Sequence, residues 1–258
     1  MTEIAFTDPC IIFALRRECQ PFLREFRPNQ RFPGAPCRAR FCGPAWLTVL
    51  LLETGVGQGR AGPALDWLLD GPSMGNVPYR PRVVISAGFS GALDKERKVG
   101  DVILATEVAD VSGNRWPATW PAELPAGEWR PPLHRGRIVT APGLASPREK
   151  ESLGKQHEAL AVDMESAAIA RACTKRGVPF GCVRVISDEL STPLSPLLLS
   201  LLSAGRVSIP RLVLALVRSP GLTGQLWRLS QQTRYAADQL SKALGELLTL
   251  TLDWGKDL

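Results

Sequence analysis

Short apolar runs, each followed by a turn or helix signal, recur through residues 10–190. Their length and β-branched content predict strands, and a run that is apolar throughout is typical of a strand buried on both faces. We predict such strands at residues 10–15, 46–53, 82–87, 101–108, 136–140 and 180–186. Because helices alternate with these strands, the pattern indicates an α/β fold whose sheet is covered on both sides.

Helix signals lie between the strands and after them. We predict helices near residues 18–24, 64–69, 163–176 and 225–250. The third has basic residues in its last turn and is ended by Gly177 and Pro179. Residues 113–137 hold five prolines and three tryptophans. Because proline fixes φ and removes a backbone donor, this segment is predicted to leave the core, as a surface loop or as a lid over a substrate.

Composition bounds the class of protein. The chain has 258 residues, of which 45% are hydrophobic and 22% charged, which is ordinary for a globular protein and excludes intrinsic disorder. It has no run of about 18 apolar residues and no secretion signal, so we expect no transmembrane segment and a cytoplasmic location. No linker divides the chain. We expect a single domain over residues 1–258, with a helical extension from about residue 190.

Charge and cysteine usage exclude further classes. The net charge of +6 comes from the two ends of the chain, without a dense Lys/Arg stripe, so we expect no nucleic-acid partner. The six cysteines form no C-x-x-C pair, and only two histidines could join them, so zinc-ligand spacing is absent. We predict reduced thiols, no metal and no cofactor.

Candidate chemistry lies where predicted strands end. Glu18 follows the first strand, the glycine turn at 88–91 follows the third, and Asp188 follows the last. Glu165 stands near a helix start. Ligands of open α/β sheets bind at the carboxyl ends of strands, so these groups could share a site. Alternatively, Glu165 only favours its helix N-terminus and Asp188 only caps a turn.

Known glycine and nucleophile motifs are missing. Gly55, Gly57 and Gly59 follow a strand, but their spacing is neither G-x-G-x-x-G nor that of a phosphate loop. The chain also lacks a G-x-S-x-G elbow. A nicotinamide dehydrogenase, a nucleoside triphosphatase and a serine hydrolase are therefore disfavoured, and the glycines are read as tight turns and close packing.

Six motifs occur in an order that resembles one enzyme family. They are IFALRRE at 12–18, TGVG at 54–57, SAGFSGAL at 86–93, VGDV at 99–102, VDMESAA at 162–168 and VRVISD at 183–188. The chain resembles the nucleoside phosphorylase/nucleosidase superfamily, which includes methylthioadenosine/S-adenosylhomocysteine nucleosidases. The tail after Asp188 looks like that of the hopanoid-associated phosphorylases. The resemblance implies a three-layer α/β/α domain with a mixed, partly barrel-like central sheet.

The same resemblance implies cleavage of the N-glycosidic bond of a purine, adenine-type nucleoside or 5′-modified nucleoside. Asp188 matches the general acid at the base, and to donate a proton it must be held protonated by a poorly solvated or charge-crowded site. Glu165 matches the carboxylate that grips the ribose, and Arg184 matches a residue that supports the acidic cluster. Further substrate-binding positions implied by the match are Asp163, Met164, Phe89, Ser90, Gly91 and Ser187.

Glu18 bears on the nucleophile. In the nucleosidases the matching glutamate activates the attacking water, so its presence favours hydrolysis. A phosphorylase would instead need groups that hold phosphate, for which Arg16, Arg17 and Gly57 are the candidates. Adjacent arginines on a strand point to opposite sides, and both can simply be solvated. Glu18 alone therefore leaves attack by water and attack by phosphate open.

Several positions depart from the family pattern. Phe89 stands at a turn position that is usually small or polar, Leu144 and Ala145 stand where an aromatic and an aliphatic residue contact adenine, and Asp163 replaces a glutamate. Residues 194–234 could cover a lipidic 5′ group, make peripheral membrane contact, or serve only as packing or a subunit contact. A non-catalytic nucleoside-binding protein is a second class, and the family implies a homo-oligomer.

Overall fold

The computed structural model describes residues 8–44, 47–120, 131–143, 145–192 and 221–250, with the side chains of 221–228 and of 250 left aside. Its strands are β1 (Cys10–Phe13), β2 (Pro28–Arg31), β3 (Arg38–Cys42), β4 (Val49–Glu53), β5 (Ser73–Met74), β6 (Val77–Pro78), β7 (Val84–Ala92), β8 (Val102–Asp110), β9 (Arg115–Pro117), β10 (Leu133–Thr140), β11 (Ala159–Asp163) and β12 (Phe180–Asp188). Its helices are α1 (Arg16–Cys19), α2 (Phe22–Glu25), α3 (Gln58–Leu69), α4 (Pro147–His157), α5 (Ser166–Lys175) and α8 (Gly221–Leu250).

One mixed sheet organises the fold, in the strand order β11-β10-β8-β12-β7-β1-β4-β3-β2. β11 also pairs with β7, so β11, β10, β8, β12 and β7 close into a ring. β1, β7 and β12 run parallel, and their carboxyl ends therefore meet at one edge. The predicted three-layer α/β/α architecture with a partly barrel-like sheet is confirmed.

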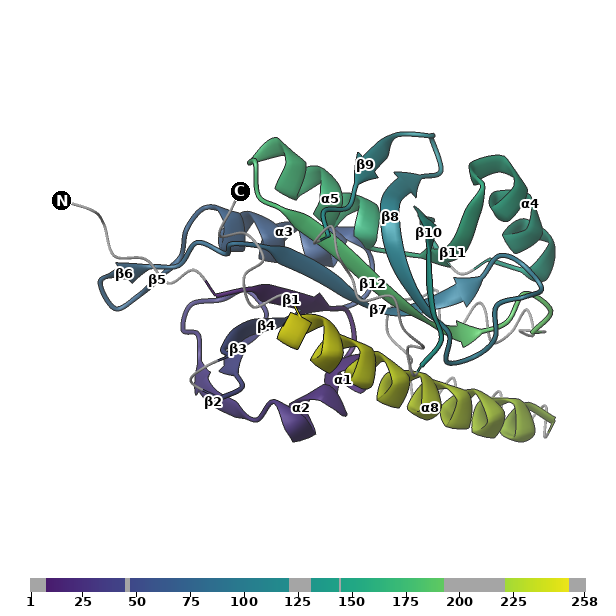
Figure 1. Cartoon of the computed structure of the whole chain (residues 1–258), viewed down its shortest axis with the longest axis horizontal. Coiled ribbons are helices and arrows are strands. Elements are labelled where there is room, and N and C mark those ends of the chain that lie inside the picture. Colours follow the sequence, from purple (N-terminus) through teal and green to yellow (C-terminus); the bar gives the residue numbers. More distant parts are fainter. Residues whose placement is uncertain (1–7, 45–46, 121–130, 144, 193–220, 251–258) are drawn as a thin grey trace.

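Helices cover the sheet on both sides (Figure 1). On one side α3 and α5 pack on the sheet through residues such as Leu65 and Ile169. On the other side α1, α2 and α8 lie together, and Phe22 and Leu240 belong to their shared core. Both cores contain strand residues with no exposed surface, because alternate side chains of each strand point to opposite faces.

Three sequence predictions need correction. Residues 88–91 are not a turn but the continuation of β7, which runs to Ala92. The segment 113–137 is not wholly outside the sheet, because β9 lies in it and β10 already begins at Leu133. The helix predicted to begin at Asp163 begins at Ser166, since β11 occupies the residues up to Asp163.

Three predictions fall wholly or partly outside the described residues. These are the loop or lid at 113–137, of which 121–130 is not described, the extension from about residue 190, of which 193–220 is not described, and the adenine-contact position Leu144. The predicted last helix is present as α8. Within the described part of the chain, no helix is long and apolar enough to cross a membrane.

Candidate active site

Residues from both ends of the chain enclose one cavity of about 250 Å³ at the edge where β1, β7 and β12 end. Leu229 and Thr233 of α8 complete its wall. The structure thereby brings together Glu18, Glu165 and Asp188, which are far apart in the sequence. Most of the predicted site residues line this cavity, namely Glu18, Phe89, Ser90, Gly91, Asp163, Met164, Glu165, Ser187 and Asp188.

Glu18 is buried at the start of the short helix α1. One carboxylate oxygen accepts the Leu15 backbone N–H at 2.7 Å, and the other accepts the Phe89 backbone N–H at 2.9 Å. Burial raises the pKa of Glu18, while the Phe89 N–H and the Arg184 charge act in the opposite direction. A carboxylate with a raised pKa, fixed by two backbone donors at the cavity wall, is suited to act as a general base.

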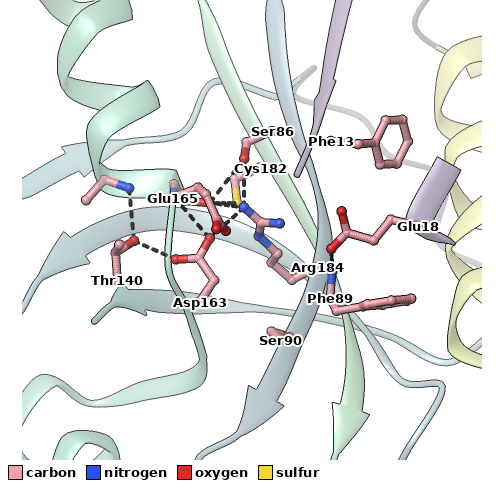
Figure 2. Close-up of polar contacts among 12 residues, drawn as sticks. Phe13, Glu18, Ser86, Phe89, Ser90, Thr140, Asp163, Glu165, Cys182 and Arg184 are labelled. Carbon is pink, nitrogen blue, oxygen red and sulfur yellow. Dashed lines mark hydrogen bonds and ion pairs between the residues drawn. The ribbon is translucent and has the colours of Figure 1, made fainter. Parts of the chain in front are cut away.

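Arg184 is a fully buried cation behind the cavity. Figure 2 shows its guanidinium between Glu18 on one side and Asp163 and Glu165 on the other. It forms an ion pair with Asp163 at 2.5 Å, and it donates to the hydroxyls of Ser86 and Ser166 at 2.8 and 2.6 Å. Burial works against its charge, but the surrounding carboxylates, Asp163 foremost, raise the pKa of Arg184 above its usual value.

Asp163 is an anchor for this arrangement. Its Oδ1 accepts the Thr140 hydroxyl at 2.6 Å, and its Oδ2 accepts the Ser166 backbone N–H at 3.1 Å and pairs with Arg184. The side chain has no exposed surface. The Ser166 contact fixes the first turn of α5, which in turn sets the position of Glu165. Asp163 therefore lies at the cavity while both of its oxygens are engaged by the protein.

Glu165 is the residue that precedes α5, and its side chain turns toward the β4–α3 loop. There Oε1 accepts the Gly57 backbone N–H at 2.7 Å. Burial and the neighbouring Asp163 charge raise the pKa of Glu165 to about 7, although Arg184 and the Gly57 N–H oppose the shift. Gly57 has φ +91, a backbone conformation that glycine adopts without strain. Glu165 can thus ionise near neutral pH beside the cavity.

Asp188 is the last residue of β12 and also lines the cavity. A register shift between β12 and β7 falls between Ile186 and Asp188. The Ser187 hydroxyl lies 3.0 Å from Asp188 Oδ1, and the Lys150 ammonium contacts Oδ2. Asp188 was expected in a poorly solvated or charge-crowded site that keeps it protonated. In the structure its side chain is 16% exposed, and the Lys150 ammonium and the Ser187 hydroxyl face it.

Four predicted residues do not line the cavity. Arg184 and Gly57 lie behind it and act through their contacts with Asp163 and Glu165. Arg16 and Arg17 lie on α1 and are exposed. Arg17 faces a different surface pocket, which it shares with Arg24 and Arg234. The two arginines proposed as phosphate ligands are therefore placed outside the cavity.

Sequence reasoning did not single out two sets of residues. The first is the part of the wall formed by Leu15, Val56, Leu229 and Thr233. Leu15 and Val56 lie inside the motifs at 12–18 and 54–57, and the other two lie in the segment 194–234 that could cover a 5′ group, but none was named as a site residue. Lys150 lies on α4, a helix that was not predicted, although Ser146 and Glu149 form a capping box with Pro147 at the first turn. That capping signal would have located the helix. In the described residues, no group of three or more His, Cys, Asp or Glu side chains is arranged to hold a metal ion.

Comparison with known proteins gives a consistent result. The model of the phosphorylase superfamily matches residues 10–127 and 122–195. A 5′-methylthioadenosine/S-adenosylhomocysteine nucleosidase of Exiguobacterium sp. is 32% identical over 166 residues, covering 55% of this chain and 68% of the relative. A nucleosidase of the same name from Actinobacillus succinogenes is 33% identical over 164 residues, with coverage of 55% and 68%.

Solved structures share the fold at low sequence identity. The 5′-methylthioadenosine/S-adenosylhomocysteine nucleosidase of Neisseria meningitidis, in complex with methylthio-immucillin-A, superposes with a TM-score of 0.66 at 19% identity, covering 95% of this chain and 100% of that one. The futalosine hydrolase of Helicobacter pylori gives a TM-score of 0.65 at 17% identity, with coverage of 95% and 98%.

Proposed function

The chain belongs to the phosphorylase superfamily, and from that premise we propose that it cleaves the N-glycosidic bond of a purine nucleoside or of its 5′-modified derivative. One observation carries the proposal: Glu18, Glu165 and Asp188 meet at a single cavity. Cleavage of this bond builds positive charge on the ribosyl ring and negative charge on the leaving base. It therefore needs carboxylates around the sugar and a proton at the base.

Glu165, Asp188 and Met164 each have a distinct role in this chemistry. Glu165 holds ribose hydroxyls and, once ionised, stabilises the positive charge that develops on the sugar. Asp188 faces the base and passes a proton to a purine ring nitrogen as the bond to C1′ breaks. Met164 lines the cavity beside Glu165, where its thioether can pack on the sugar.

Water is the nucleophile that the site favours. Glu18 is fixed by two backbone N–H groups and has a raised pKa, so it can take a proton from a water molecule that attacks C1′. A phosphate ion there would face the charge of Glu18, whereas Arg16 and Arg17 are exposed elsewhere and Arg184 is paired with Asp163. We therefore propose hydrolysis rather than phosphorolysis.

The apolar part of the wall bears on the substrate class. Leu15, Val56 and Leu229 line the cavity together with Thr233. These side chains offer no partner for a charged 5′ group and suit an apolar one, such as a thioether. A carboxyl oxygen of Asp188 can accept a hydrogen bond, which fits the amino group of an adenine-type base. We propose 5′-alkylthio adenosines as the first substrates to test.

The deciding assay follows free base by chromatography. The purified protein is incubated with adenosine, inosine, methylthioadenosine and S-adenosylhomocysteine, with and without phosphate. Release of adenine without phosphate is expected. Strict dependence on phosphate would replace hydrolysis by phosphorolysis. Binding of a nucleoside without any release of base would instead indicate a non-catalytic nucleoside-binding protein and overturn the proposal.

Variants assign the roles. Asp188→Asn and Glu18→Gln should each lower kcat by about 10²- to 10⁴-fold, the range typical of lost acid or base catalysis. Glu25→Gln, which changes an exposed glutamate on α2, is the matched control and should leave kcat unchanged. Full activity in the Asp188 or Glu18 variant would reject the corresponding role.

Assembly and location belong to the proposal as well. We propose a homo-oligomer, as the sequence resemblance implies, and a cytoplasmic location. Light scattering coupled to size exclusion measures the mass in solution. A mass equal to that of one 28.1 kDa chain at all concentrations would reject the oligomer.

A further inference from the structure

Lys150 is a lysine in an unusual place. It lies on α4, most of which is polar and faces solvent, yet only 3% of its side chain is exposed. Lys155 on the same helix shows the ordinary arrangement, with 76% of its side chain exposed and an ion pair to Glu151 one turn away. Burying an ammonium group costs free energy unless fixed partners compensate it. The partners of Lys150 therefore indicate what it does.

Those partners are at the active site. The Lys150 ammonium contacts Asp188 Oδ2, and it donates to the backbone carbonyl of Glu189 at 3.1 Å. The carboxylate of Glu189 itself turns to Lys98, at 3.4 Å. Asp188 and Ser187 line the cavity, whereas Lys150 does not. Any effect of Lys150 on a bound nucleoside must consequently pass through Asp188.

The backbone of β7 makes room for this pair. A Cβ atom on Gly91 would lie 2.9 Å from Lys150 Cε and 3.1 Å from both Lys150 Nζ and Asp188 Oδ2. Such distances are shorter than ordinary van der Waals contact, so a side chain at Gly91 would displace the ammonium or the carboxyl group from the places they occupy beside this strand. The irregular register beside Asp188 turns the end of β12 at the same point.

The Lys150 ammonium is the main fixed partner of the Asp188 side chain. The Ser187 hydroxyl lies 3.0 Å from Asp188 Oδ1, but it also lies 3.2 Å from the Ser90 carbonyl oxygen, and its single proton serves one of them at a time. The ammonium has three protons and contacts both Asp188 Oδ2 and the Glu189 carbonyl oxygen. The orientation of the Asp188 carboxyl group therefore depends chiefly on Lys150.

We propose that Lys150 is the positioning residue of Asp188: its ammonium holds the Asp188 carboxyl group at the cavity, in the orientation from which it delivers a proton to the leaving base. This inference rests on the proposed function. In that step the Asp188 O–H bond breaks as a new N–H bond forms at a ring nitrogen of the purine, while the electron pair of the C1′–N bond stays on the base.

A double-mutant cycle tests the inference. Lys150→Met keeps the aliphatic stem and removes the charge, and Lys150→Gln keeps a donor for the Glu189 carbonyl. In the wild-type background each should lower kcat for methylthioadenosine about 100-fold, with KM changed less than about threefold. In the Asp188→Asn background, the same substitutions should change single-turnover rates less than about threefold, because coupled residues are not additive.

Lys155→Met is the matched control on the same helix and should leave kcat and KM unchanged. Thermal melts of all variants identify loss of folding, and Lys150→Gln supplies the measurement if Lys150→Met does not fold. A merely structural role for Lys150 would lower the rate equally in both backgrounds. That result, or full activity of Lys150→Met, would overturn the inference while wild-type turnover still stands. Absence of turnover in the wild-type protein overturns the proposed function instead, and the inference with it.

Discussion

Arg184 and Asp163 form an ion pair at 2.5 Å in which neither side chain is more than 2% exposed. The pair joins β12 to the end of β11, and β11 leads directly into Glu165 and α5. It also places one positive charge among several carboxylates, including Glu18 and Glu165. The geometry of the cavity and its electrostatics therefore depend on the same contact.

Removing Arg184 should damage folding as well as activity. Arg184→Met leaves Asp163 as a buried charge without its cation, and such a loss costs about 3–5 kcal/mol of the free energy of unfolding. Urea unfolding followed by circular dichroism measures this. Arg176→Met, which breaks partly exposed ion pairs to Asp66 and Asp70, is the control and should cost about 1 kcal/mol or less. Equal losses in the two variants would contradict the role given to the buried pair.

Glu165 should make the folded protein less stable as pH rises. Its pKa is about 7 in the folded protein, above the ordinary value of 4.5, because of burial and the Asp163 charge. The folded state therefore binds the proton more tightly. The stabilisation from Glu165 is complete below pH 4.5 and is lost as pH rises through about 7. Glu165→Gln removes this dependence.

Urea unfolding of both proteins at several pH values between 4.5 and 8 is the measurement. The free energy of unfolding of the wild type, relative to Glu165→Gln, should fall across that interval and then level off. A constant difference between the two proteins would show that Glu165 does not titrate in this range.

Gly88 should tolerate no side chain. A Cβ atom there would lie 2.8 Å from Glu18 Oε1 and still nearer the Arg184 guanidinium. Gly88→Ala should therefore cost about 1–3 kcal/mol by overpacking and lower kcat by displacing Glu18. Gly59→Ala provides the contrast. Gly59 is an exposed residue of α3 with open space around it, and alanine there should stabilise the protein by about 0.5–1 kcal/mol. A neutral Gly88→Ala would mean that Glu18 and Arg184 are not held against β7.

Thr140 should contribute to the free energy of unfolding through its hydroxyl group. It donates to Asp163 Oδ1 at 2.6 Å and accepts the Ala167 backbone N–H at 2.9 Å, and both bonds are buried. Thr140→Val keeps the shape and loses both, at a cost of about 1–3 kcal/mol. Thr48→Val, which loses an exposed bond to the Pro44 carbonyl, should change the free energy of unfolding by less than about 0.5 kcal/mol. A stable Thr140→Val would exclude this bond as a support of Asp163.

The strongest elements could be predicted because they are apolar and locally marked. β1, β4 and β12 are continuous buried runs, and Gly177 at the end of α5 has the positive φ that such a helix end favours. β2 was missed since all its residues are polar or proline and exposed, so it shows no hydrophobic period. The glycines of β7 were read as a turn, because a sequence does not distinguish a glycine that bends the chain from one that admits a neighbouring side chain.

The site residues also fall into those that the sequence could predict and those that it could not. The residues of the motifs, Glu18, Glu165 and Asp188 among them, could be placed by resemblance, and the cavity brings them together. Lys150, Leu229 and Thr233 could not be placed individually, because they reach the site from α4 and α8 through tertiary packing alone. Their identity as lysine, leucine or threonine is ordinary for any exposed or core position. These residues become part of the site only because the sheet closes into a ring and the helices pack over it.

Closure of β11 onto β7 also bears on how the protein avoids self-association. Within the described residues every strand of that ring pairs with a neighbour on both sides, β11 with β7 through Ala161 and Val162, so the ring has no edge strand. The path of strands ends at β2, whose exposed sequence contains a proline and an arginine. Both residue types discourage the edge-to-edge stacking that leads to fibrils.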